Sequence, residues 1–239
     1  MKVTPIRTRI SLEDENLSEF IQKHVRRLPE RSILAVTSKI VSLSEGRARG
    51  ARDRRAKERL IKSESQWAMR TKYTWLTIKD NTVMASAGVD ESNANGKLIL
   101  LPRESFRSAK RIRKELQKRY KTKHLGVVIT DSCLLPLRAG IVGMALGYAG
   151  FRGVRDYRGK SDIFRRKLTL SQTDVADSVA TAAVLTMGEG AEQQPLALIE
   201  DAPVEFTERV SRRELWIDPR EDIYQPLFEK IKKITWKKK

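Results

Sequence analysis

The apolar run at residues 125–130 constrains the fold of this chain more than any other segment. It is short, rich in β-branched residues and followed by Asp131 and Ser132, which predicts a buried β-strand. Before it, Pro102 can open a helix whose buried face repeats at helical spacing. That face consists of Phe106, Ala109, Ile112, Leu116 and Tyr120. A helix leading into a buried strand predicts a layered α/β or mixed α+β fold.

Further strands and helices alternate along the rest of the chain, without an internal repeat. Strands are predicted at residues 3–9, 33–43 and 195–199, with a hairpin at 75–79 and 82–87 around Asp80 and Asn81. Helices are predicted at residues 52–72 and 174–187, the latter between an Asp174 cap and Gly188. Another helix carries Leu17, Phe20, Ile21, Val25 and Leu28 after a start signal at Ser11 and Asp14. A terminal helix would carry Tyr224, Leu227, Ile231 and Ile234. The expected organisation is one domain over residues 1–200 and an extension over residues 201–239.

Composition favours a folded protein of a reducing compartment. Hydrophobic residues make up 40% of the 239 residues, enough to bury a core. The single cysteine, Cys133, excludes a disulfide within the chain. No signal-peptide pattern opens the sequence and no apolar run reaches membrane-spanning length, so we expect a cytoplasmic location and no membrane partner.

Positive charge is concentrated in three stretches, at residues 47–62, 103–123 and 230–239. The formal net charge is +18. An excess of this size attracts polyanions such as nucleotides, phosphorylated substrates or RNA. A solvated basic surface is the other interpretation of each stretch.

Three acidic residues lie at predicted element ends, where side chains can converge. Asp90 and Asp131 follow strand patterns, and Glu189 stands between Gly188 and Gly190 after a helix. Carboxylates of this kind can hold Mg²⁺ or Mn²⁺ against nucleotide phosphates. Asp and Glu beside glycine also serve as turn and cap residues, so spacing alone leaves both interpretations open.

Two other motifs are rejected. Residues 153–161 end in Gly-Lys-Ser, but five residues separate Gly153 from Gly159 where a P-loop has four. Cys133 has no histidine that the sequence can place beside it, because His24 lies in a helix pattern and His124 before a strand. A packed cysteine is therefore favoured over a Cys-His nucleophile or zinc site.

Several ordered segments together resemble the coenzyme F420 γ-glutamyl ligase family. They are TSKIVS at 37–42 with EGR at 45–47, AGVDESN at 87–93, ITD at 129–131 and MGEG at 187–190, with GIVG at 140–143 and Ala176-Asp177 between them. The likeness covers residues 2–200 and is nearest to the bacterial branch assigned to folate metabolism. It implies a mixed α/β fold in an intertwined homodimer. It also implies an enzyme that uses GTP, or ATP, with Mg²⁺ or Mn²⁺ and K⁺ to add L-glutamate to a deazaflavin or folate-like carboxylate through an acyl phosphate.

The resemblance also implies site residues. Asp90 and Asp131 would hold one metal, Ser132 and Glu189 a second, with Asp131 and Glu189 as catalytic residues. Nucleotide contacts would come from Ser38, Lys39, Asn93, Met187, Gly188, Gly190 and Gln194, and from residues 8–11.

Two departures from the family pattern bear on activity. Leu43 replaces a usual lysine, and residues 132–138 (SCLLPLR) replace the usual Thr-Asn-Gly-Arg continuation. An alkyl side chain cannot bind phosphate, although Lys39 or Arg138 can supply a cation. The alternative function is a non-catalytic nucleotide- or RNA-binding protein that retains the ligase fold, with RNA on the basic helix of residues 103–123.

Overall fold

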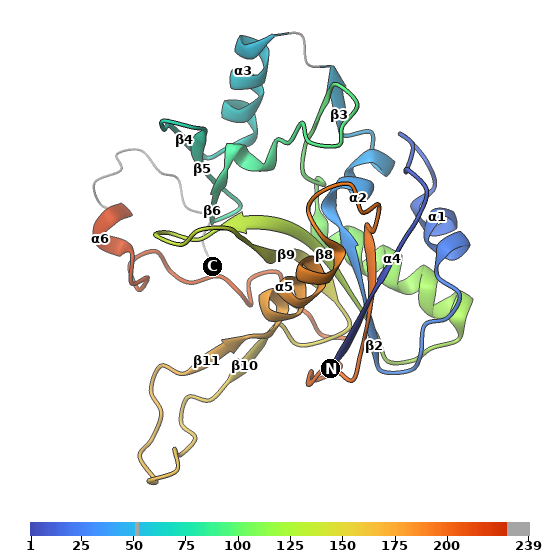
Figure 1. Cartoon of the computed structure of the whole chain (residues 1–239). Coiled ribbons are helices and arrows are strands. Elements are labelled where there is room, and N and C mark those ends of the chain that lie inside the picture. The colour runs from blue at the N-terminus through green and yellow to red at the C-terminus, as the bar shows by residue number, and fades with distance from the viewer. Residues whose placement is uncertain (51–52, 229–239) are drawn as a thin grey trace.

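A five-stranded sheet forms the centre of the molecule. The computed structural model describes residues 1–50 and 53–228. The strand order is β1-β12-β2-β8-β9, in which β2 and β8 are parallel and the other neighbours antiparallel (Figure 1). The strands span Lys2–Ile6 (β1), Leu196–Glu200 (β12), Ser32–Thr37 (β2), Leu125–Leu134 (β8) and Ile141–Ala149 (β9).

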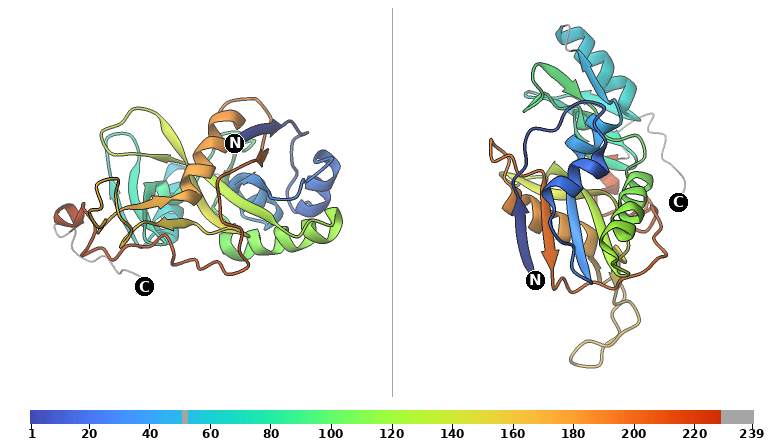
Figure 2. Two further views of the ribbon diagram at one scale, coloured as in Figure 1. Left: turned by 90° about the horizontal axis from the view of Figure 1, so that it is seen from below. Right: turned by 90° about the vertical axis from the view of Figure 1, so that its right-hand side faces the viewer.

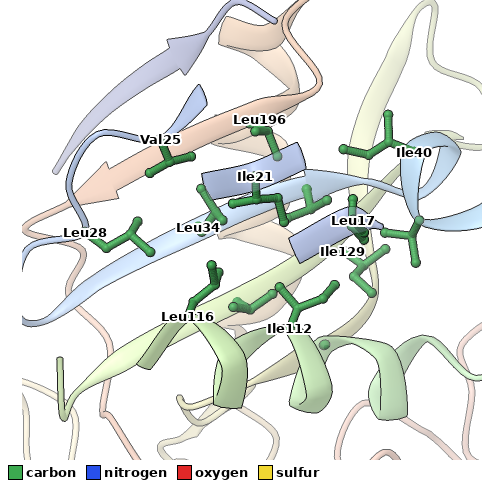
Figure 3. Close-up of a cluster of buried hydrophobic side chains, with 14 of the residues drawn as sticks. Leu17, Ile21, Val25, Leu28, Leu34, Ile40, Ile112, Leu116, Ile129 and Leu196 are labelled. Carbon is green, nitrogen blue, oxygen red and sulfur yellow. The ribbon is translucent and has the colours of Figure 1, made fainter. Parts of the chain in front are cut away.

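Helices cover both faces of this sheet (Figures 1 and 2). One face packs against α1 (Leu17–His24), α2 (Ser38–Ser44) and α4 (Ser105–Tyr120), and the other packs against α5 (Val175–Met187). Side chains of β2 alternate between the two: Leu34 and Val36 join the first core, Ile33 and Ala35 the second. Figure 3 shows the first core, with Ile112 and Leu116 of α4 facing β8. The mixed α/β fold class is therefore confirmed.

A smaller lobe lies beyond one end of the sheet and is called the α3 lobe (Figure 1). It contains α3, a three-stranded sheet β4-β5-β6, the pair β3-β7 and the short helix η1. Their bounds are Ala48–Gly50 (β3), Arg54–Glu64 (α3), Trp67–Arg70 (β4), Trp75–Lys79 (β5), Thr82–Ala85 (β6), Ser86–Gly88 (η1) and Lys97–Ile99 (β7). Its own core consists of Ile61, Trp75, Val89, Leu98 and Leu100.

Two segments extend from the central body. Strands β10 (Val154–Asp156) and β11 (Gln172–Asp174) pair and carry a long connecting loop, and residues 154–174 are called the arm (Figure 1). Residues 201–228, the strap, end in α6 (Gln225–Phe228). The buried Arg113 of α4 binds the strap, since its guanidinium donates to Glu208 at 2.7 Å. None of the helices described, in residues 1–50 and 53–228, has the length and apolar character to cross a bilayer.

Most of the predicted elements are confirmed. The hairpin has its turn at Asp80 and Asn81, both with positive φ, as I′ turns require. Asp174 caps α5 by accepting from the Asp177 amide, and Gly188 ends that helix. Strand β9 packs closely on α5. A Cβ at Gly143 would lie 2.4 Å from the Ala180 carbonyl oxygen, so only glycine fits there.

Several boundaries differ from prediction. Residues 33–43 form strand β2 and then helix α2, and the single helix predicted at 52–72 is replaced by α3 over Arg54–Glu64 and then β4 over Trp67–Arg70. Helix α1 begins after Asn16, which caps it, and not at the Ser11–Asp14 signal. Strand β8 continues through Asp131 and Ser132 to Leu134, because β9 pairs along that whole length. The terminal helix is seen as one turn, α6; Ile231 and Ile234 lie outside the described residues.

Candidate functional site

The site begins where β2 turns into α2, at Ser38 and Lys39. Because β2 and β8 are parallel and in register, Thr37 lies opposite Thr130. The next residue on each segment is then a site residue. The Ser38 hydroxyl donates to Asp131 Oδ1 at 3.0 Å. The change from strand to helix after Thr37 therefore places Ser38, a predicted nucleotide contact, against Asp131, a predicted metal ligand.

Asp90 reaches the same place from the α3 lobe. Ser86 and Ala87 both have positive φ, and this turn delivers the chain to Asp90, whose backbone pairs with Ile99. Lys39 Nζ lies 2.8 Å from Asp90 Oδ2 and also donates to the Ser92 carbonyl oxygen at 2.6 Å. Burial raises the pKa of Asp90, but the hydrogen bonds from Lys39 and Ser92 outweigh it and leave the pKa lowered. Asp90 is therefore held as a carboxylate.

The pKa of Asp131 is shifted in the opposite direction. Burial raises the pKa of this carboxyl to about 6, and the charge of Asp90 adds to the rise against the hydrogen bonds from Ser38 and the Ser132 amide. A buried carboxyl whose ionisation is unfavourable is stabilised as a carboxylate by a neighbouring cation. The surroundings of Asp90 and Asp131 are thus anionic, and Lys39 contributes a positive charge beside Asp90.

The second part of the network lies on the other face of β8. The Ser132 hydroxyl donates to Glu189 Oε1 at 2.7 Å. Glu189 belongs to the loop of residues 188–194, called the GEG loop, which follows α5. Asn93 binds this loop by donating from Nδ2 to the Gly190 carbonyl oxygen at 3.0 Å. Four segments far apart in the chain are thereby joined at one place.

The GEG loop is also fixed by its own residues and by the N-terminal segment. Gly188 has φ +80°, a conformation that favours glycine, and the Gly190 amide donates to Glu192 Oε2 at 2.8 Å. The Thr8 amide donates to the Gln193 carbonyl oxygen at 2.9 Å. Met187 differs from the other predicted nucleotide contacts, since its side chain is buried in the α5 core; Gln194 is half-buried just before β12.

The oxygen donors of the site suit a hard divalent cation. Asp90, Asp131, Ser132 and Glu189 offer carboxylate and hydroxyl oxygens, which Mg²⁺ and Mn²⁺ prefer. Within residues 1–50 and 53–228, no three His, Cys, Asp or Glu side chains cluster closely enough to hold an ion by themselves. Mg²⁺ bound to nucleotide phosphates commonly takes only one or two protein carboxylates.

The two residues proposed to replace the family lysine have different positions. Leu43 lies in the last turn of α2, and Lys39, one turn earlier, contacts Asp90. Arg138 is exposed in the turn that joins β8 to β9, beyond the far end of β8 from Thr130. Lys39 is therefore the cation that the fold brings into this network.

The P-loop-like segment and both histidines lie away from the network. Lys160 and Ser161 are in the arm, between β10 and β11. His24 Nδ1 lies 2.8 Å from the Phe20 carbonyl oxygen, and the His124 ring packs against Phe206. Both histidines thus contribute to packing.

A second feature of the site was not predicted. A groove of about 770 Å³ lies between the β5–β6 hairpin, the outer parts of β8 and β9, the start of α4 and the strap. Its lining is mainly apolar and includes Cys133, Met144 and Trp216. The departure of residues 132–138 from the family pattern was the one sequence signal, because Cys133, Leu134, Leu135 and Pro136 all line this groove.

Comparison with known proteins gives a consistent result. Residues 5–201 match the family model described as F420-0:Gamma-glutamyl ligase. Coenzyme F420:L-glutamate ligase of Methanococcus maripaludis is 32% identical over 231 residues, covering 89% of this chain and 92% of the relative. The protein of the same name from Archaeoglobus fulgidus is 29% identical over 229 residues, covering 88% and 90%. That from Methanocaldococcus jannaschii is 40% identical over 128 residues, covering 54% and 51%.

Proposed function

The chain belongs to the F420-0:gamma-glutamyl ligase family, and from that membership we propose that it joins L-glutamate by an amide bond to a carboxylate of coenzyme F420-0 or a related deazaflavin or folate-like acceptor. The convergence of Ser38–Asp131, Lys39–Asp90, Ser132–Glu189 and Asn93–Gly190 carries the proposal. Such a network brings cationic, anionic and hydroxyl groups to one place, as phosphoryl transfer requires.

Amide formation from a free carboxylate needs activation, for which we propose a nucleoside triphosphate, GTP or ATP. An acceptor carboxylate oxygen attacks the γ-phosphorus, the bond to the β-phosphate oxygen breaks, and an acyl phosphate and nucleoside diphosphate form. The glutamate amine then attacks the acyl carbon, and inorganic phosphate leaves. The protein contributes mainly by positioning the reactants and by stabilising charge.

Each polar group has a proposed part in this reaction. Lys39 lies against Asp90 and can contact a phosphate oxygen from the same position. Asn93 and the amides of the GEG loop would contact the nucleotide. Ser38 holds the Asp131 carboxylate in place by a hydrogen bond. Asp90, Asp131, Ser132 and Glu189 would hold Mg²⁺ or Mn²⁺, which when bound neutralises charge on the transferring phosphoryl group. K⁺ would be a further cation of the nucleotide site.

The direct test is incubation with GTP or ATP, Mn²⁺, L-glutamate and either F420-0 or folate, read by mass spectrometry for a glutamate adduct. We expect an adduct with one acceptor and its loss in Glu189→Gln, because the amide cannot replace the carboxylate charge. The matched control is Glu192→Gln in the same loop, whose amide oxygen can still accept from the Gly190 N–H. An adduct at wild-type rate in Glu189→Gln would contradict the assigned site.

We also propose that the protein is a homodimer, as the family resemblance implies. Its support is the arm, where Ile163, Phe164 and Leu170 are 90%, 83% and 87% exposed. Exposed apolar residues at the end of a projecting segment favour contact with another protein surface. Light scattering should give a dimer mass for the wild type and a monomer mass for Phe164→Ser. A monomeric wild type would contradict this proposal and leave the ligase proposal intact.

A further inference from the structure

The groove beside the polar network is formed by segments from four parts of the chain. Cys133, Leu134 and Met144 come from β8 and β9, Met84 from the β5–β6 hairpin and Phe106 from α4. The strap closes the opposite side with Trp216. A volume of about 770 Å³ lies in the range of small-molecule binding sites, and an apolar lining with a few polar groups is typical of them.

The groove is continuous with the candidate site through strand β8. Asp131 pairs across the sheet with Met144, which lines the groove. Cys133 lies two residues beyond Asp131 and therefore on the same face of β8, and it also lines the groove. The lining residues Cys133 and Met144 are thus the neighbours of Asp131 on one face of the sheet.

The polar groups of the groove indicate what kind of molecule fits. The charged side chains of the lining are mixed: acidic residues outnumber basic ones, and Arg212 pairs with Glu104 at 3.3 Å. Asp174 and Asp177 also line the groove, and Asp177 accepts the Ala145 amide at 2.8 Å. Carboxylates accept N–H donors, which a nitrogen heterocycle supplies and a lipid chain does not.

We propose that this groove binds the aromatic heterocycle of the acceptor, with the carboxylate to be activated at the Asp131 end. The inference rests on the proposed function and adds to it the place where the ring system of the acceptor binds. Glutamate and the nucleotide phosphates are polar throughout and belong in the Lys39–Asp90 network. The apolar groove would hold the ring system apart from them, while the acceptor carboxylate meets them near Asp131.

Cys133 provides a direct probe because it is the single cysteine of the chain and lies in the groove. The wild-type protein is treated with iodoacetamide, and the alkylated fraction is followed by intact mass. F420-0 or folate, added with GTP and Mn²⁺, should slow alkylation at least about tenfold, which corresponds to about 1.4 kcal/mol. L-glutamate alone and GTP alone should leave the rate unchanged. Unchanged alkylation with every acceptor that yields an adduct would overturn the inference.

A pair of variants in the turn after β8 tests the same point by kinetics. Leu135 lines the groove at 47% exposure, whereas Leu137 is fully exposed and is not part of the lining. Leu135→Arg should raise the KM for the acceptor at least about tenfold, because a charge replaces apolar contact, and leave nucleotide affinity unchanged. Leu137→Arg should behave as wild type in both respects.

The outcomes separate this inference from the proposed function. An adduct formed equally well by both variants, without Cys133 protection, would reject the groove and retain the ligase. No adduct with any acceptor, together with no protection, would reject both. Sedimentation of both variants tests a second copy of the chain as the occupant. A monomer for Leu135→Arg beside a dimer for Leu137→Arg would make the groove a subunit interface and overturn the inference.

Discussion

The polar network and the apolar groove meet at Asp131 and are built in different ways. In the network, each acid has a named partner: Ser38 for Asp131, Lys39 for Asp90 and Ser132 for Glu189. The groove is instead a surface shared by the hairpin, two strands, a helix and the strap. In the proposed function, the reaction depends on a few hydrogen bonds and ion pairs in the network. Binding of the acceptor depends on many apolar contacts in the groove. Substitutions in the two regions should therefore have effects of different kind and size.

The largest expected effect comes from Asp131, the acidic residue of the network that lies next to the groove on β8. Asp131→Ala removes the carboxylate next to Ser38 and should lower kcat/KM by about 10²- to 10³-fold, as loss of one electrostatic group in an active site commonly does. The adduct assay with the acceptor well below its KM measures it. Asp201→Asn is the control, because Asp201 is an exposed residue with φ +54°, which asparagine also adopts readily. A loss of less than about twofold in Asp131→Ala would remove Asp131 from the chemistry.

A smaller effect is expected for the cation of the network. Lys39→Met keeps the length of the side chain and removes the charge that faces Asp90. We expect nucleotide affinity to fall about tenfold, measured by calorimetry, while the acceptor still protects Cys133. Lys97→Met is the control, because Lys97 pairs with Glu13 at the surface, where such pairs contribute little. Equal losses in both variants would mean that Lys39 has no special part in binding.

Asp177, whose carboxyl lines the groove, should make the free energy of unfolding depend on pH. Burial, and then the charge of Asp174, raises the pKa of Asp177 to about 7. Because this folded-state pKa is raised, ionisation of Asp177 costs folding stability as pH rises from about 4 to 7, and the cost persists above pH 7. Asp177→Asn, whose amide oxygen can still accept the Ala145 N–H, should therefore be stabilised by about 1 kcal/mol at pH 8 and by nothing at pH 4.

Denaturant unfolding at the two pH values checks that expectation. Asp162→Asn in the arm is a matched control, since Asp162 is a half-buried carboxyl outside both regions and an amide oxygen can still accept from the Phe164 and Arg166 amides. A destabilised Asp177→Asn at pH 8 would show that the hydrogen bond to Ala145 requires the charge.

The smallest effect is expected from the basic outer face of α4. Arg107, Lys110, Arg111 and Lys114 are exposed on that helix, while Ile112 and Leu116 face the core. Replacing the four cations with glutamine should change kcat/KM for ligation by less than about twofold, because solvated charges far from the reacting groups contribute weakly. RNA binding by the wild type that is lost in this variant and falls steeply with salt would favour the nucleic-acid interpretation of that face.

Much of the fold could be predicted because its signals are local. The hairpin turn at Asp80 and Asn81, the Asp174 cap and the apolar period of α4 each specify an element within one short stretch. The error at residues 33–43 has a physical cause. Ile40 and Val41 continue the apolar, β-branched composition of β2, yet they pack into the first core from helix α2. Composition does not distinguish a buried strand from a short buried helix.

The sequence by itself determined which residues could do the chemistry, since Asp90, Asp131, Ser132 and Glu189 stand in recognisable motifs. The tertiary structure decided their partners and the groove. Lys39 faces Asp90, and Ser38 faces Asp131, because β2 and β8 pair in parallel register and the α3 lobe returns Asp90 to that point. Strap and hairpin residues contribute to the groove without any common motif. Contacts between distant segments depend on strand register and packing, which no short stretch of sequence specifies.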